Sequence, residues 1–140
     1  MCFPLRNLYY PLMIENGYSV IANIASMAHR RGGPGHSVHY ASAKGAVVTL
    51  TMGVAREFVN PGIRALSTSL GHINTALGHI NTAFQSISSP ERKKRMTNDV
   101  LMKRIGTPEE IGEIVLFMCS NTCEFMTADT VNVNGGGGFR

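Results

Sequence analysis

Three side chains in the first third of the sequence could together move a proton at an alcohol or carbonyl oxygen. Tyr40 and Lys44 are four residues apart, so a helix would place both on one face. A tyrosine alone is a poor base at neutral pH because its pKa is about 10, but a neighbouring ammonium group favours the phenolate and lowers that pKa. Ser26, fourteen residues before Tyr40, carries a hydroxyl that can hold a substrate oxygen beside the pair. The three residues therefore predict general acid–base catalysis.

Three apolar runs predict the strands that would position these residues. They cover residues 19–25, 63–69 and 130–134. We expect the first strand to be buried on both faces, because its run is apolar rather than alternating. Ser26 follows the first strand, and Leu70 and Gly71 follow the second. In a parallel sheet these positions lie at the edge where ligands bind.

Two helices are expected to connect the strands. Apolar residues at spacings of three and four predict a helix over residues 38–58. This stripe consists of Ala43, Val47, Leu50, Val54 and Phe58. Thr107 can cap a second helix that begins at Pro108. Its expected buried face consists of Ile111, Ile114, Val115 and Met118. The alternation of strands and helices predicts an α/β fold with a parallel sheet and crossover helices.

Four segments of the chain resemble the short-chain dehydrogenase/reductase family. They are Asn23–Ser26, Tyr40–Ala46, Pro108–Gly112 and Thr130–Gly136, in the family's order and roughly at its spacing. The resemblance runs from about Met13 to Gly136. It implies a Rossmann-like doubly wound parallel sheet, present here as three C-terminal strands with their crossover helices.

The resemblance also implies a role for each of the first three residues. Tyr40 would be the catalytic acid/base, and Lys44 would bind the nicotinamide ribose and lower the pKa of Tyr40. Ser26 would hydrogen-bond the substrate oxygen. Hydride would pass between the nicotinamide ring of NAD or NADP and the carbon of a carbonyl or alcohol substrate.

A tandem repeat occupies the segment after the second strand. Residues 70–76 read Leu-Gly-His-Ile-Asn-Thr-Ala, and residues 77–83 repeat them. Family members carry one Pro-Gly-x-Ile-x-Thr segment here, which contacts the nicotinamide carboxamide. We expect a local duplication in a surface loop, with the first copy as the functional one because it directly follows the strand. Gly71, Ile73 and Thr75 would then contact the cofactor, and Gly71 would allow its close approach.

The glycine-rich turn that holds the dinucleotide phosphates in the family is not found in this sequence. Gly32–Gly35 follows the strand that bears Ser26, and only Phe139 and Arg140 follow Gly135–Gly138. Neither run joins a first strand to a first helix. We therefore expect residues 1–140 to form the C-terminal, catalytic half of a family domain, without its dinucleotide-binding half. The choice between NAD and NADP stays open.

The composition and the net charge limit which binding partners and which cellular compartment we expect. Hydrophobic residues make up 44% and charged residues 16%, which excludes a disordered tail. No apolar run approaches the roughly 18–20 residues of a membrane span, so we expect no membrane partner. The net charge of +4 is modest and scattered, so we expect no nucleic-acid partner. Three cysteines do not make a disulfide framework, which favours a reducing, cytoplasmic setting.

We expect structural roles for the clusters of histidine, cysteine and basic residues. No carboxylate or cysteine completes a metal site around His29, His36 and His39. We therefore expect these histidines to be polar loop residues, and we expect no metal. We expect Cys119 and Cys123 to be packed or solvent-exposed thiols rather than a redox or zinc site. The basic run at residues 92–95 is expected to be a solvated helix face, with a lid over the substrate pocket as the open alternative.

A second function remains open beside the enzyme. The chain could be an inactive truncated fragment that acts as a dimerisation or interaction module. In the family, the helix after the catalytic tyrosine packs against its mate, so a homo-oligomer through residues 38–58 is expected. Without a neighbour, the strand over residues 19–25 would become an exposed apolar edge.

Overall fold

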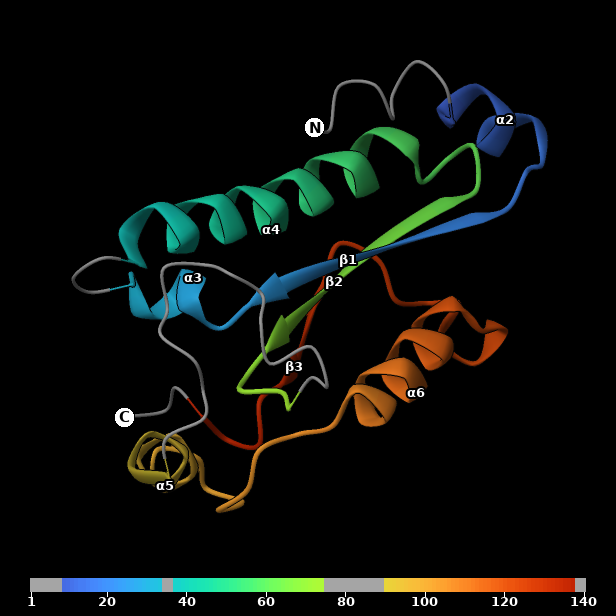
Figure 1. The fold of residues 1–140 in the computed structure, drawn as a ribbon. Coiled ribbons are helices and arrows are strands. Elements are labelled where there is room, and N and C mark those ends of the chain that lie inside the picture. The colour runs from blue at the N-terminus through green and yellow to red at the C-terminus, as the bar shows by residue number, and fades with distance from the viewer. Residues whose placement is uncertain (1–8, 34–36, 75–89, 138–140) are drawn as a thin grey trace.

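A computed structural model describes residues 9–33, 37–74 and 90–137 of the chain (Figure 1). In chain order the elements are α2 (Tyr10–Glu15), β1 (Ser19–Ser26), α3 (Ala28–Arg31), α4 (Val38–Phe58), β2 (Ile63–Leu70), α5 (Pro90–Asn98), α6 (Pro108–Cys119), the 3₁₀ turn η2 (Asn121–Cys123) and β3 (Thr130–Val133). The predicted strands and the predicted helix over residues 38–58 are confirmed to within one residue at each end. The second copy of the repeat, residues 77–83, lies outside the described residues.

The three strands form one parallel sheet in the order β1–β2–β3. Strands β1 and β2 pair along their whole length, from Ser19 opposite Ile63 to Ser26 opposite Leu70. Strand β3 pairs with the second half of β2. Helix α4 covers one face of the sheet and α6 covers the other (Figure 1). This is the Rossmann-like, doubly wound arrangement that the resemblance implies.

Strand β2 is the buried centre of the sheet. All of its residues from Ile63 to Ser69 are buried. On one face, Ala65 packs with Val54 and Ala55 of α4. Because side chains alternate along a strand, the neighbouring Arg64 points to the opposite face, towards α6.

The buried face of α4 differs from the predicted apolar stripe. Ala43 and Leu50 of that stripe are exposed. The helix instead buries Ala41, Thr51, Val54 and Ala55. Thr51 is accommodated because its hydroxyl accepts from the amide of Asn23 at 2.9 Å and donates to the carbonyl of Val47 at 2.8 Å. Small side chains and a hydrogen-bonded hydroxyl let α4 lie close to the sheet. The positions of the apolar residues alone therefore did not identify the buried face of this helix.

The prediction that the first strand is buried on both faces is wrong. Most residues of β1 are only half-buried, and Ile24 is 42% exposed. The reason is its position, because β1 lies at the edge of the sheet and no strand of the described residues covers its outer side.

A buried arginine ties β2 to the segments that precede β3. Arg64 is 6% exposed, and no carboxylate of the described residues contacts it. Its guanidinium donates to the carbonyl oxygens of Met118, Ser120, Cys123 and Met126 at 3.1–3.3 Å and to the hydroxyl of Tyr18 at 3.2 Å. Burial lowers the pKa of Arg64, but hydrogen bonds to the Tyr18 hydroxyl and the Cys123 thiol outweigh it and raise that pKa. The side chain is therefore a permanent cation that joins three segments.

Replacing Arg64 with methionine should lower the free energy of unfolding by about 3–5 kcal/mol, because several buried carbonyl oxygens lose their donor. Arg56→Met, on the exposed surface of the last turn of α4, is the matched control and should cost less than about 1 kcal/mol. Urea unfolding at neutral pH measures both values. Equal losses in the two variants would show that the guanidinium does not hold these segments together.

Candidate active site

Backbone hydrogen bonds define an outer edge on β1. The N–H of Ser19 donates to Gly62, and the N–H of Met27 donates to Leu70. In a parallel ladder, alternate residues bond the same neighbour, so the odd-numbered residues of β1 bond β2. The even-numbered residues, from Val20 to Ser26, direct their N–H and C=O groups away from β2. These groups line the edge at which the candidate catalytic residues meet.

Lys44 reaches this edge from α4. Its Nζ donates to the carbonyl oxygen of Ile24 at 2.9 Å and lies 5.9 Å from the centroid of the Tyr40 ring. Tyr40 is 38% exposed, whereas Lys44 is half-buried. The structure thus brings Tyr40 and Lys44 together on one face of the helix, beside the end of β1.

Ser26 ends β1, and two local contacts hold it. Its Oγ accepts from the N–H of Ala28 at 3.2 Å, which leaves the hydroxyl hydrogen available for donation. The Nδ1 atom of His29 lies 2.6 Å from the Ser26 carbonyl oxygen. Because a carbonyl only accepts, this contact assigns the proton to Nδ1. No hydrogen bond among the described residues joins Ser26 to Tyr40 or Lys44.

His29 therefore corrects the sequence analysis, which treated it as a loop polar residue. It lies in the short helix α3 and contacts the backbone of Ser26. Its position three residues after Ser26, at the start of a helix, is the signal that could have identified it.

Gly71 and Ile73 follow β2 and are held by neighbouring segments. The N–H of Gly71 donates to the last carbonyl of β3 at 3.0 Å, and a Cβ atom on Gly71 would lie 2.7 Å from the Cα of Asn134. The close approach that this glycine allows is therefore to Asn134, whereas the sequence suggested a ligand. Ile73 pairs with Gly106 in a parallel bridge. Thr75 lies outside the described residues.

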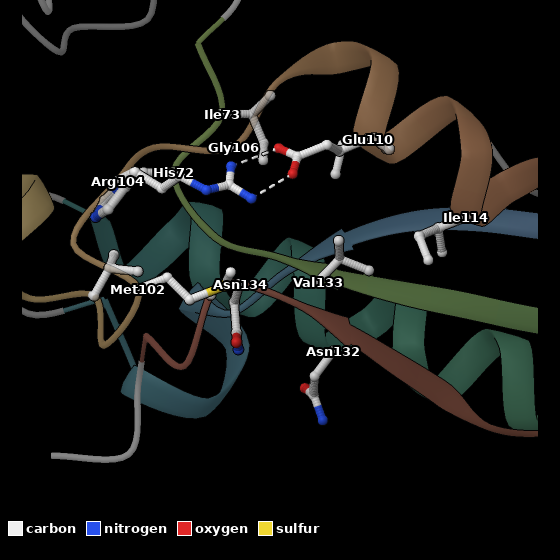
Figure 2. Close-up of a pocket in the computed structure, with 13 residues that line it drawn as sticks. His72, Ile73, Met102, Arg104, Gly106, Glu110, Ile114, Asn132, Val133 and Asn134 are labelled. Atoms are coloured by element: carbon white, nitrogen blue, oxygen red, sulfur yellow. Dashed lines mark hydrogen bonds and ion pairs between the residues drawn. The ribbon is translucent and has the colours of Figure 1, made fainter.

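A cavity of about 330 Å³ lies between this segment, α6 and the end of β3 (Figure 2). Its apolar lining comes from Ile73, Val100, Met102, Ile111, Ile114 and Val133, and its polar lining includes His72, Arg104, Glu110, Asn132 and Asn134. Figure 2 shows Arg104 reaching across to Glu110 beside Ile73. Sequence analysis did not identify this cavity, because its walls come from segments far apart in the chain.

The carboxylate of Glu110 serves both the cavity wall and the start of α6. It forms a bidentate ion pair with Arg104, at 2.5 and 2.8 Å. It also accepts from the N–H of Thr107 at 2.9 Å, while the Thr107 hydroxyl accepts from the N–H of Glu110 at 3.3 Å. This capping box confirms the predicted helix start. The bonds from Arg104 and then from Thr107 lower the pKa of Glu110 to about 2.

The described glycine clusters do not form an open cradle for phosphate. A Cβ atom on Gly136 would lie 2.7 Å from the Leu101 side chain, and one on Gly33 would lie 2.4 Å from the Ser37 carbonyl oxygen. The N–H of Gly136 is already bonded to the Asn134 side chain. Phosphate binding needs free backbone N–H groups around a concave space. Gly33 and Gly136 are therefore packed closely against neighbouring segments and do not surround an open space.

Within residues 9–33, 37–74 and 90–137, no three His, Cys, Asp or Glu side chains gather as a metal-binding group. None of the described helices combines the length and hydropathy that a bilayer span requires. Cys119 is exposed and Cys123 is buried, and both are free thiols.

Known proteins match nearly the whole chain. A family model described as enoyl-(acyl carrier protein) reductase matches residues 3–137. The 2-dehydro-3-deoxy-L-rhamnonate dehydrogenase (NAD(+)) of Sphingomonas sp. is 32% identical over 138 residues, covering 94% of this chain and 52% of that protein.

Solved structures match as well. A 3-oxoacyl-[acyl-carrier protein] reductase of Brucella melitensis with bound NAD aligns with a TM-score of 0.77 at 28% identity, covering 98% of this chain and 47% of that one. A Beutenbergia cavernae protein determined with bound NADP aligns with a TM-score of 0.83 at 29% identity, covering 96% of this chain and 52% of that one. The chain thus spans about half the length of the relatives it matches.

The carboxyl group of Glu110 should stay ionised until about pH 2. Because its pKa is lowered on folding, its contribution to stability is present above about pH 4.5 and is lost as the pH falls towards 2. Carboxyl ¹³C shifts measure this titration directly. Arg104→Gln should raise the pKa towards its ordinary value, whereas Arg95→Gln on α5 should leave it unchanged. A midpoint near pH 4 in the unsubstituted chain would contradict the role given to Arg104.

Proposed function

The chain belongs to the short-chain dehydrogenase/reductase family, and from that premise we propose that it provides the catalytic half of an NAD- or NADP-dependent oxidoreductase. The proposed reaction is hydride transfer between the nicotinamide ring and a carbonyl or alcohol carbon of a small substrate. The observation that carries the proposal is the contact of Lys44 with both the Tyr40 ring and the carbonyl oxygen of Ile24, two residues before Ser26 at the carboxyl end of β1. The dinucleotide, when bound, supplies the hydride donor or acceptor.

Tyr40 is the proposed acid/base. Its ring is partly exposed, and the ammonium nitrogen of Lys44 lies 5.9 Å from the ring centroid. In the direction of reduction, its hydroxyl gives a proton to the carbonyl oxygen as that oxygen gains charge. In the direction of oxidation, the phenolate accepts the proton of the substrate hydroxyl.

Lys44 is the proposed ribose contact as well as the charge partner of Tyr40. An ammonium group has three N–H donors, and one of them bonds the Ile24 carbonyl oxygen. The remaining donors can bond ribose hydroxyls at the same edge. Ser26 completes the site, because its Oγ already accepts from Ala28 and so directs its own hydrogen to a substrate oxygen.

The segment after β2 supports a contact with the nicotinamide carboxamide. Gly106 bonds the carbonyl of His72 at 3.0 Å and the N–H of Asn74 at 2.9 Å. By the alternation of a parallel bridge, the N–H and C=O of Ile73 itself point away from Gly106. These two groups can pair with an amide. Gly71 and Thr75 are included in the proposed carboxamide contact only because they match the family motif.

A second candidate function is an interaction module without turnover. It is favoured by the absence of an amide cradle among the described residues and by the outer face of α4. Between residues 41 and 55 the helix carries one charged side chain, Lys44. Exposed residues of this stretch include Ala43, Ala46, Leu50 and Gly53. An uncharged face of small and apolar residues suits packing against a second copy, so a homo-oligomer through α4 is part of both proposals. A cytoplasmic setting is also proposed, because Cys119 and Cys123 are free thiols.

The catalytic proposal is tested by fusing the upstream half of the Brucella melitensis reductase to this chain and measuring cofactor oxidation with a panel of ketones. Tyr40→Phe should lower kcat by about 10²–10⁴-fold, because the proton donor is lost. Ser42→Ala, at an exposed position of the same helix, is the matched control and should keep the rate. An active fusion that retains its rate after Tyr40→Phe would refute the mechanism, and a folded but inactive fusion would favour the interaction module.

The isolated chain should bind NADH more weakly than micromolar, because the described residues provide no cradle for the phosphates. Amide chemical shifts should change mainly around Lys44 and Ile73. Nicotinamide mononucleotide should bind about as weakly as NADH, since the adenylate half has no described contact. Micromolar binding of NADH by the isolated chain, with a clear preference over the mononucleotide, would contradict this expectation.

A further inference from the structure

The three candidate catalytic residues come from two elements whose relative position decides whether they can act together. Ser26 ends β1, whereas Tyr40 and Lys44 lie on α4. A substrate oxygen that is held by Ser26 and exchanges a proton with Tyr40 needs both hydroxyls within about 3 Å. Lys44 joins α4 to β1 at Ile24, two residues before Ser26. The position of Ser26 itself therefore depends on contacts made beyond Ile24.

Helix α3, which begins two residues after Ser26, lies beside the first part of α4 (Figure 1). It ends at Gly32, whose φ of 74° is left-handed. A Cβ atom on the next residue, Gly33, would lie 2.8 Å from the Cβ of Ala41, closer than packed carbon atoms approach. The absence of a side chain thus lets the end of α3 touch the start of α4.

His29 of α3 touches both elements that carry the candidate catalytic residues. Its Nδ1 atom donates to the carbonyl oxygen of Ser26 at 2.6 Å. Its Cβ lies against α4 at Gly45, where a built Cβ atom would be 3.8 Å away. Gly45 directly follows Lys44 and lies five residues after Tyr40. One side chain therefore links the residue with the hydroxyl to the turns of α4 that bear the acid/base pair.

The bond from His29 is the second of two that hold Ser26. The Ser26 Oγ accepts from the N–H of Ala28 at 3.2 Å, which restrains the side-chain torsion. The bond to the Ser26 carbonyl oxygen restrains the peptide that follows, and with it the backbone torsion of Ser26. The hydroxyl is thus set in one direction before a substrate binds. A donor ordered in advance need not be ordered during the reaction.

We propose that His29 is a positioning residue, which holds the Ser26 hydroxyl in place relative to Tyr40 and Lys44. This role rests on the proposed hydride transfer, because positioning has an effect on rate only where that reaction occurs. The ring acts through Ser26 and does not carry the reacting proton, since Nδ1 is already bonded to a carbonyl oxygen. A misplaced Ser26 weakens a bond that strengthens as charge develops on the substrate oxygen, so the loss of His29 should affect kcat more than KM.

The ring ¹⁵N chemical shifts of the unsubstituted chain test the contact without any variant. At alkaline pH a solvent-exposed imidazole carries its proton mainly on Nε2, whereas a bond to a carbonyl oxygen selects Nδ1–H. His29 should therefore show a protonated Nδ1 and a bare Nε2. His39, at an exposed position of α4, is the internal control and should show the ordinary Nε2–H form. A bare Nδ1 at His29 would overturn the proposal.

Variants of the active fusion described above test the effect on rate. His29→Ala should lower kcat about 3–10-fold with little change in KM, because one hydrogen bond is lost. His29→Asn should restore kcat to within about twofold, since its amide N–H can donate to the same carbonyl oxygen. Arg30→Ala, at the exposed neighbouring position of α3, is the matched control and should keep the rate.

A double-mutant cycle separates positioning of Ser26 from a general structural role. In a fusion that already carries Ser26→Ala, the further change His29→Ala should leave the residual kcat unchanged, because the hydroxyl it positions is gone. A similar loss in both backgrounds would overturn the proposal, as would an unchanged kcat after His29→Ala or a failure of His29→Asn to restore it. In each of these cases a rate that still depends on Tyr40 would leave the proposed function standing. A rate that survives Tyr40→Phe would overturn both.

Discussion

One buried cation on the central strand holds the α6 side of the sheet in place. Arg64 is charged at every accessible pH, yet its partners in the described residues are carbonyl oxygens, a hydroxyl and a thiol rather than a carboxylate. These partners belong to the entry of β1, the end of α6 and the approach to β3. The opposite face depends on the packing of Ala65 against Val54 and Ala55. A buried cation with directed hydrogen bonds thus joins segments on the α6 side, whereas on the α4 side small apolar side chains pack closely and Thr51 bonds Asn23.

The alternation of a parallel ladder explains where the candidate site lies. Because β2 pairs on both sides, each of its residues turns its peptide group to one neighbour. Strand β1 has a neighbour on one side among the described residues, so half of its peptide groups remain available at its outer edge. Lys44 and His29 use this edge as an anchor. In the described residues, the side chains of Lys44 and His29 thus lie along the outer margin of β1.

The sequence predicted the elements well and the contacts less well. Periodicity located residues 38–58 and the three strands, and Thr107 marked the start of α6, because these signals are local. The predicted buried face of α4 was wrong at Ala43 and Leu50, which are exposed. The face that packs on the sheet depends on small side chains and on the hydrogen bonds of Thr51. The spacing of Tyr40 and Lys44 predicted their proximity, and the position of His29 three residues after Ser26 is a local signal of its contact. The cavity depends on where distant segments meet, which no local pattern encodes.

The bridge between Ile73 and Gly106 has a consequence for the tolerance of this fold to changes in length. Gly71 is fixed to the end of β3, and Asn74 is fixed to Gly106, so the chain that leaves β2 is anchored twice within four residues. The seven-residue duplication begins its second copy at Leu77, beyond both anchors. Inserting residues there does not shift the register of β2. The bridge therefore separates the register of the sheet from the length of the sequence that follows Asn74, so that sequence can change in length over evolution while the carboxyl end of the sheet keeps its geometry.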